Sequence, residues 1–162
     1  MIAADILAAD ILAAARAKGI RIATAESCTG GMIAAALTDI AGSSDVFDRG
    51  FVTYSNAAKV AMLGVSQTTL AAFGAVSDQI AAEMADGAAA RAGVALAVAS
   101  TGIAGPGGSE FKPEGRVCFG LAMRGQPTKT QTIEFGPLGR AAVRTAATDY
   151  ALGMLLAALN RD

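Results

Sequence analysis

The sequence contains no histidine and no tryptophan, and only two of its 162 residues are cysteine. Without histidine the chain can form no Ser-His-Asp triad, no Cys-His pair and no histidine-ligated metal site. The two cysteines, Cys28 and Cys118, are too few for a disulfide framework, which fits a reduced, cytoplasmic protein. Hydrolytic chemistry in this chain therefore has to use lysine, tyrosine, hydroxyl groups, a thiol or carboxylates.

Charge is also sparse and nearly balanced, with 13 basic and 14 acidic residues and a net charge of -1. This balance lacks the basic footprint of nucleic-acid-binding proteins, so we expect no nucleic-acid partner. The mean hydropathy of +0.46 comes largely from small side chains. No run of about 20 apolar residues lacks a charge, glycine or proline, so we expect no membrane span. The length predicts one domain over residues 1–162.

Strand-like and helix-like segments alternate along the chain. Apolar runs of strand length alternate with segments of helical periodicity, and Ser77 is a good N-cap for one helix. The pattern predicts an α/β fold: a single-domain three-layer α/β/α sandwich with a mixed, mostly parallel central sheet and a hairpin near its end. The expected strands are residues 20–25, 51–54, 94–99, 117–123 and 130–135, and the expected helices include 2–18, 33–40, one capped by Asn56, one from about 65, one after Ser77 and one from about 137.

The first candidate functional segment is residues 24–31, Thr-Ala-Glu-Ser-Cys-Thr-Gly-Gly, between a strand and a helix. Ligands of open α/β sheets bind at the carboxyl ends of the strands. A helix start there could hold an anion or a forming oxyanion, and the Ser27 hydroxyl could be a nucleophile if a base is near. The alternatives are that the hydroxyl groups only cap the helix, or that Cys28 is the nucleophile.

The second candidate is Lys59, the one of four lysines that closely follows an expected strand. Burial lowers the pKa of a lysine, so a desolvated Lys59 could serve as the base for a serine in a chain without histidine. Tyr54 could relay a proton or orient Lys59. The alternatives are an ordinary surface lysine and a tyrosine at a strand end.

Two further segments could contact a substrate. Residues 101–108 contain four glycines, which allow the backbone to approach a ligand closely but also suit a tight connector. Arg140 and Arg144 are four residues apart on one helix face, where two guanidinium groups could clamp a phosphate or simply be solvated.

In order and spacing, these motifs resemble the CinA C-terminal domain family over roughly residues 5–158. The resemblance is carried by residues 24–31, 42–44, 51–56 with Lys59, 74–77, and 101–108 with Lys112 and Pro113. It implies a nicotinamide-nucleotide amidase that hydrolyses the carboxamide of nicotinamide mononucleotide to nicotinate mononucleotide and ammonia. It also implies a three-layer α/β/α fold, a homo-oligomer, no metal and no cofactor. Longer relatives carry a molybdopterin-binding-like domain before this one, so we expect a stand-alone form.

The resemblance also assigns roles to single residues. Ser27 would be the nucleophile and Lys59 the base, with Tyr54 assisting. Backbone N–H groups near residues 28–31 or Gly102 would hold the oxyanion. The substrate-binding set would comprise Thr29, Gly30, Gly31, Ser43, Ser44, Thr101, Gly102, Gly105, Arg140 and Arg144.

The sequence departs from the family pattern at three positions. Gly139 stands where an aspartate is frequent, Glu114 where a short apolar residue is usual, and Arg116 where a small residue is usual. These departures bear on substrate preference more than on reaction type. Two alternatives remain open: an amidase with an altered substrate, and a non-catalytic module that binds a protein partner, since family members are linked to DNA uptake and recombination.

Overall fold

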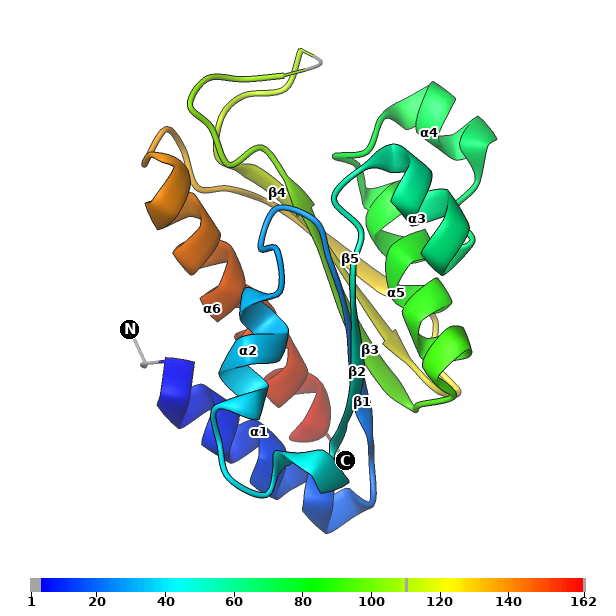
Figure 1. The fold of residues 1–162 in the computed structure, drawn as a ribbon, viewed down its shortest axis with the longest axis vertical. Coiled ribbons are helices and arrows are strands. Elements are labelled where there is room, and N and C mark those ends of the chain that lie inside the picture. The colour runs from blue at the N-terminus through cyan, green and yellow to red at the C-terminus, as the bar shows by residue number, and fades with distance from the viewer. Residues whose placement is uncertain (1–3, 110, 162) are drawn as a thin grey trace.

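The computed structural model describes residues 4–109 and 111–161 and shows a five-stranded sheet covered by helices on both faces (Figure 1). Residues 2 and 3 of the expected first helix lie outside the described residues. Along the chain the elements are α1 (Ala4–Lys18), β1 (Ile22–Glu26), α2 (Met32–Thr38), the 3-10 turn η1 (Ser43–Asp45), β2 (Phe47–Val52), α3 (Asn56–Leu63), α4 (Gln67–Phe73), α5 (Asp78–Ala92), β3 (Leu96–Gly102), β4 (Arg116–Met123), β5 (Lys129–Glu134) and α6 (Arg140–Leu159).

The strand order in the sheet is β2-β1-β3-β4-β5. Strand β1 pairs in parallel with both β2 and β3, whereas β4 is antiparallel to β3 and to β5. Four strands therefore run in one direction and β4 alone opposes them. The α/β class and the mixed sheet are confirmed, and the expected hairpin is formed by β4 and β5.

Helices α1, α2 and α6 cover one face of the sheet, and α3, α4 and α5 cover the other (Figure 1). Alternate strand residues point to opposite faces: Ile22 packs with the first group of helices and Ala23 with the second. Small residues bring α5 very close to the sheet. A Cβ on Gly120 of β4 would lie 2.3 Å from the carbonyl oxygen of Ala81. The abundance of alanine and glycine therefore reflects tight helix-on-sheet packing.

A serine side chain caps the N-terminus of three helices, α3, α4 and α5. Ser77 accepts a hydrogen bond from the Ile80 N–H, as the sequence predicts, and Ser66 caps α4 in the same way. The prediction that Asn56 caps α3 is wrong, because Ser55 is the N-cap and accepts from the Ala58 N–H. Each cap fixes the direction in which the helix leaves the preceding segment.

The carboxyl ends of β1, β2 and β3 lie at one edge of the sheet because these three strands are parallel. The segments that follow them, residues 27–31, 53–55 and 103–109, therefore meet at this edge. In the described part of the chain no helix combines the length and apolar character needed to cross a membrane.

Candidate active site

Ser27 and Lys59 are in contact at this edge of the sheet. Ser27 directly follows β1, and its backbone N–H donates to the carbonyl of Ser100 on β3 at 3.0 Å. Lys59 lies on α3 and is 1% exposed. Its Nζ donates to Ser27 Oγ at 3.0 Å and to the carbonyl of Thr53 at 2.8 Å. The structure thus brings together two residues that the sequence analysis selected from separate segments.

Burial changes the acid–base behaviour of Lys59. Desolvation by burial lowers the pKa of Lys59 from 10.5 to about 8. With that pKa about one Lys59 in ten is neutral at pH 7. A neutral amine 3.0 Å from a hydroxyl group can accept its proton. The pair therefore places a hydroxyl group beside an amine that is partly neutral at pH 7, which is the geometry that a nucleophile and a general base require.

Cys28 is a poor alternative nucleophile. Its side chain is buried, and burial raises the pKa of the Cys28 thiol to about 11. The reactive form of cysteine is the thiolate, so a thiol with this pKa is almost entirely protonated at neutral pH. Of the two candidate nucleophiles that follow β1, the structure favours Ser27.

A buried carboxylate organises the turn that carries Ser27. Glu26 has no exposed surface, and its two oxygens accept from the Thr29 hydroxyl at 2.7 Å and from three backbone N–H groups. Those N–H groups belong to Gly31, Ile33 and Ala34, at 3.2, 2.9 and 3.0 Å. The protein's own anion thus occupies the start of α2, where the sequence analysis considered an external anion.

Glu26 is a residue of the site for which the sequence predicted no role. The available signal was a single acidic residue between an apolar strand and a helix start, where a carboxylate is stabilised by free N–H groups.

Three predicted substrate contacts are engaged by groups of the protein itself, two of them by Glu26. Thr29 is fully buried, and its Oγ1 binds Glu26 and Ser100 Oγ, the latter at 2.7 Å. The Gly31 N–H donates to Glu26, and the Gly30 N–H donates to the Ser27 carbonyl. In the described part of the chain, the backbone N–H groups of Cys28 and Thr29 donate to no other group. Of these two residues only Cys28 lines the pocket, so its N–H group is the candidate donor of the turn to a ligand there.

A pocket of about 320 Å³ opens over the Ser27–Lys59 pair. One wall is formed by residues 101–109, of which the first two end β3 and the rest form the loop after it. The start of α3 and the segment before α5 form the other wall. Of the residues predicted from the sequence, Ser27, Lys59, Tyr54, Thr101, Gly102, Gly105 and Arg140 line it. Sequence reasoning missed Asn56, Ala75 and Val76, which only the packing of α3 and α5 brings to the pocket.

The rim of the pocket is formed by Tyr54 and Arg140. Tyr54 is 59% exposed, and its hydroxyl accepts a hydrogen bond from the Arg140 guanidinium. Arg140 also donates to the Gly105 carbonyl at 2.8 Å. Among the described residues Tyr54 makes no hydrogen bond to Ser27 or Lys59, so this geometry does not support its predicted assistance to Lys59. The Thr101 hydroxyl donates to the Ala75 carbonyl at 2.9 Å.

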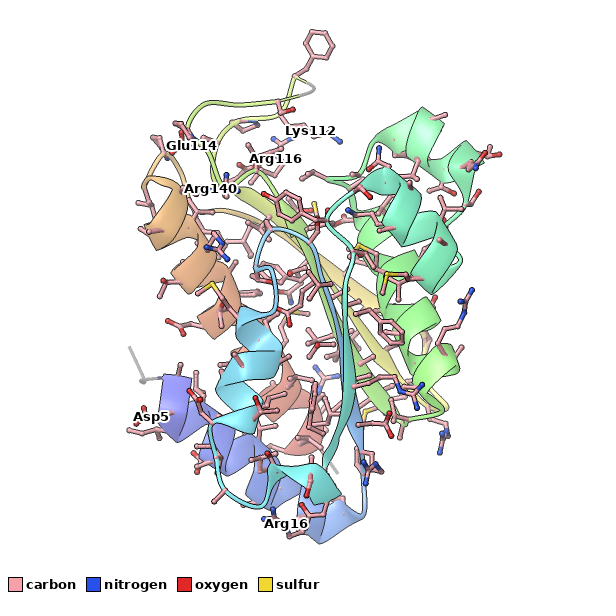
Figure 2. The ribbon with its side chains drawn as sticks, in the orientation of Figure 1. Asp5, Arg16, Lys112, Glu114, Arg116 and Arg140 are labelled. Atoms are coloured by element: carbon pink, nitrogen blue, oxygen red, sulfur yellow. The ribbon has the colours of Figure 1, made fainter. Side chains whose placement is uncertain are left out.

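Two other predicted substrate contacts lie away from the pocket. Ser43 and Ser44 belong to η1, which precedes β2 and therefore lies at the opposite edge of the sheet. Their neighbour Asp45 pairs with Arg16, which Figure 2 shows at the other end of the molecule from Arg140. The substrate-binding roles expected for Ser43 and Ser44 are therefore not retained.

Arg144 lies one helical turn from Arg140 but points to the turn that carries Ser27. It donates to the Cys28 carbonyl at 3.0 Å and to the Thr29 carbonyl at 3.5 Å, and it does not line the pocket. The predicted clamp of two arginines thus reduces to Arg140. Arg144 instead holds the turn that carries Ser27.

The charged side chains that line the pocket are positive. Lys59 and Arg140 are the ionised side chains among its lining residues, and no carboxylate lines it in the described part of the chain. Residues 4–109 and 111–161 also contain no group of three or more histidine, cysteine, aspartate or glutamate side chains arranged to hold a metal ion. The pocket is suited to a ligand that carries negative charge.

Comparisons with known proteins agree over most of the chain. Residues 4–159 match the family model described as the CinA C-terminal domain. Nicotinamide-nucleotide amidohydrolase PncC of Enterobacter agglomerans is 54% identical over 147 residues, which cover 90% of this chain and 89% of that protein. A CinA-like protein of Chlorobium phaeobacteroides (strain BS1) is 58% identical over 121 residues, or 73% of this chain, but these make up only 29% of that longer protein.

Solved structures show the same fold. The crystal structure of competence/damage inducible protein CihA from Agrobacterium tumefaciens superposes with a TM-score of 0.93 at 50% identity. The match covers 98% of this chain and 96% of that one. On the evidence of the family model and of relatives matched over nearly their whole length, the chain belongs to the CinA C-terminal domain family.

Proposed function

We propose that this protein is an amidohydrolase that converts nicotinamide mononucleotide to nicotinate mononucleotide and ammonia. The observation that carries the proposal is the 3.0 Å contact between Ser27 Oγ and the buried Nζ of Lys59. The similarity to nicotinamide-nucleotide amidohydrolase PncC over most of both chains supports the substrate. The positive charge of the side chains that line the pocket also supports this substrate, because the substrate carries a negatively charged phosphate.

The reaction begins with neutral Lys59. It takes the Ser27 hydroxyl proton while Oγ attacks the carboxamide carbon, which the electron-poor pyridinium ring activates. The carbonyl oxygen becomes an oxyanion in the tetrahedral intermediate. The N–H group of Cys28, a residue that lines the pocket, is the proposed donor to it, and a preorganised donor of this kind is worth about 3–4 kcal/mol in acyl transfer.

Collapse of the intermediate breaks the C–N bond. Protonated Lys59 gives its proton to the departing nitrogen, so ammonia leaves and an ester joins the nicotinoyl carbonyl carbon to Ser27 Oγ. Lys59 is then neutral again and takes a proton from water as the water attacks this ester. The C–O bond to Ser27 then breaks, and protonated Lys59 returns its proton to Oγ. Nicotinate mononucleotide leaves, Ser27 and neutral Lys59 are restored, and no metal takes part in these steps.

The phosphate of the substrate is assigned to Arg140. The start of α2 is occupied by Glu26, and Arg144 is engaged by the Cys28 and Thr29 carbonyls. Arg140 lines the pocket and uses only part of its five N–H donors on Gly105 and Tyr54. In this arrangement the Tyr54 hydroxyl group holds the Arg140 side chain at the rim and does not relay a proton to Lys59.

A catalytic role also explains why Lys59 is buried. Lowering the pKa of Lys59 from 10.5 to about 8 costs the folded state on the order of 3 kcal/mol near neutral pH, at about 1.4 kcal/mol per unit. A module that only bound a protein partner would gain nothing from this cost. Strongly perturbed groups in a pocket are typical of catalytic sites.

The test is ammonia release from nicotinamide mononucleotide by the purified protein in the presence of a chelator. Ser27→Ala should abolish release, whereas Ser44→Ala, a matched change at the opposite edge of the sheet, should leave it intact. Release that persists in folded Ser27→Ala protein would refute the assignment of the nucleophile. No release from folded wild-type protein would refute the proposed substrate.

A further inference from the structure

One carboxylate links two walls of the pocket. Glu114 lies between the pocket loop and β4 and is half-buried. Its Oε1 accepts from the Gly107 N–H at 2.7 Å, and its Oε2 accepts from the Gly139 N–H at 3.1 Å. Gly107 belongs to the loop that lines the pocket, and Gly139 is the N-cap of α6. The two oxygens thus connect segments that are 32 residues apart in the sequence.

The same side chain packs against a third point of the rim. Gly105 has φ +93°, and a Cβ there would lie 2.5–2.8 Å from the Glu114 side chain. The carbonyl of Gly105 accepts from Arg140, the first residue of α6. Figure 2 shows Glu114 and Arg140 at the same end of the molecule, beside the start of α6. Glu114 therefore contacts the loop on either side of Pro106 and the helix that carries Arg140.

Glu114 also provides the N-cap hydrogen bond that α6 lacks from its own sequence. Gly139 has no side chain with which to cap α6. Glu114 supplies a carboxylate to the Gly139 N–H from another segment, at the end of the helix where a negative charge is favourable. Glu114 therefore caps α6 from outside the helix.

The catalytic pair is held by other contacts. The Ser27 N–H donates to the Ser100 carbonyl, and Lys59 Nζ donates to the Thr53 carbonyl. Neither contact involves the 105–107 loop, and Arg144, the α6 residue that holds the Ser27 turn, lies one helical turn beyond the Gly139 cap. A change at Glu114 should thus move the rim while leaving the nucleophile and its base in place.

We propose that Glu114 is a positioning residue that fixes the 105–107 backbone and Arg140 relative to each other, and that it acts on substrate binding rather than on the chemical step. Charge-assisted hydrogen bonds to backbone N–H groups are short and directional. A rim held in its binding geometry before the substrate arrives loses less entropy on binding. That this substrate is nicotinamide mononucleotide rests on the proposed function.

The first experiment compares Glu114→Ala and Glu114→Gln with Glu134→Gln. Glu134 is an exposed glutamate on β5 that pairs with Arg116 outside the pocket. We expect Glu114→Ala to raise KM for nicotinamide mononucleotide about tenfold with kcat within about twofold, as for loss of a hydrogen bond to a charged group. Glu114→Gln keeps one acceptor oxygen and should give a smaller rise, and Glu134→Gln should match wild type.

A second readout follows the catalytic pair without the substrate. Phenylmethylsulfonyl fluoride reacts when Ser27 Oγ attacks sulfur and displaces fluoride, and it is too small to need the rim. Its rate with Glu114→Ala should stay within about twofold of wild type. A KM equal to that of wild type would overturn the proposal. So would kcat and the labelling rate falling together, because that result indicates a general structural role.

Hydrogen exchange tests the same inference independently of the substrate. In Glu114→Ala the amides of Gly107 and Gly139 should exchange at least about tenfold faster, because each loses its acceptor. The Lys59 amide, which donates to the Ser55 carbonyl, should be unchanged. Unchanged exchange at both glycines would overturn the proposal even if the wild-type protein releases no ammonia. Absence of ammonia alone would refute only the proposed function.

Discussion

The burial of Lys59 makes a quantitative prediction about the pH dependence of catalysis. The base must be neutral to accept the Ser27 proton, and the pKa of Lys59 is about 8. Below this pH kcat/KM should fall about tenfold for each pH unit, and above it kcat/KM should level off. An unburied lysine with a pKa of 10.5 would be neutral only about 3 times in 10,000 at pH 7, so burial raises the neutral fraction about 300-fold.

The assay is ammonia release measured as kcat/KM between pH 6.5 and 9.5. Lys18→Met, a change at an exposed lysine at the end of α1, should leave the profile unchanged. Lys59→Met should abolish activity in a folded protein. A profile that keeps rising to pH 9.5 would show that Lys59 is not desolvated as described. A folded and active Lys59→Met protein would show that the base is another group.

The same pKa shift predicts a change in stability. The pKa of Lys59 is lower in the folded state than in the unfolded chain, so between about pH 8 and 10.5 the unfolded state binds more protons. Stability contributed by this group should therefore rise with pH through that window, by up to about 3 kcal/mol. Urea unfolding of wild type and Lys59→Met at pH 7.5 and 10 isolates the contribution. Equal pH dependence in the two proteins would contradict the reasoning.

Four further predictions concern the other residues of the site. Cys28→Ala should keep most of the activity that Ser27→Ala loses, and the reverse result, measured by ammonia release, would make the thiol the nucleophile. Arg140→Ala should raise KM for nicotinamide mononucleotide about 10-fold or more, since a charged hydrogen bond is worth about 1.5–3 kcal/mol. KM for nicotinamide riboside, which lacks the phosphate, should rise much less. Equal rises for both substrates would show that Arg140 does not bind the phosphate. Glu26→Gln should lower the free energy of unfolding by about 2–4 kcal/mol, because a buried amide cannot accept at both ends; urea unfolding measures this, and an unchanged midpoint would contradict it. A chelator should leave kcat unchanged in a steady-state assay, and a loss restored by added metal would refute a metal-free mechanism.

The sequence by itself determined the fold class and where the chemistry could lie. Alternating apolar runs and helical periodicity predicted the layered α/β arrangement, because these patterns are local and each element buries its own apolar face. The missing histidine directed attention to Lys59, and the strand-to-helix position directed it to Ser27. Local spacing also identified the 101–108 loop, which lines the pocket.

Only the tertiary structure decided which side chains meet. The order β2-β1-β3 and the return of α3 set the contact between Ser27 and Lys59, 32 residues apart. The tertiary structure also places Ser43 and Ser44 at the opposite edge of the sheet from the pocket. Hydrogen-bond partners at a helix start come from whichever segment packs there. Glu26 therefore binds N–H groups at the start of α2, where the sequence suggested an external anion, and Glu114 binds the Gly139 N–H at the start of α6. Local patterns determine elements, whereas long-range packing determines which donors and acceptors remain free to act on a substrate.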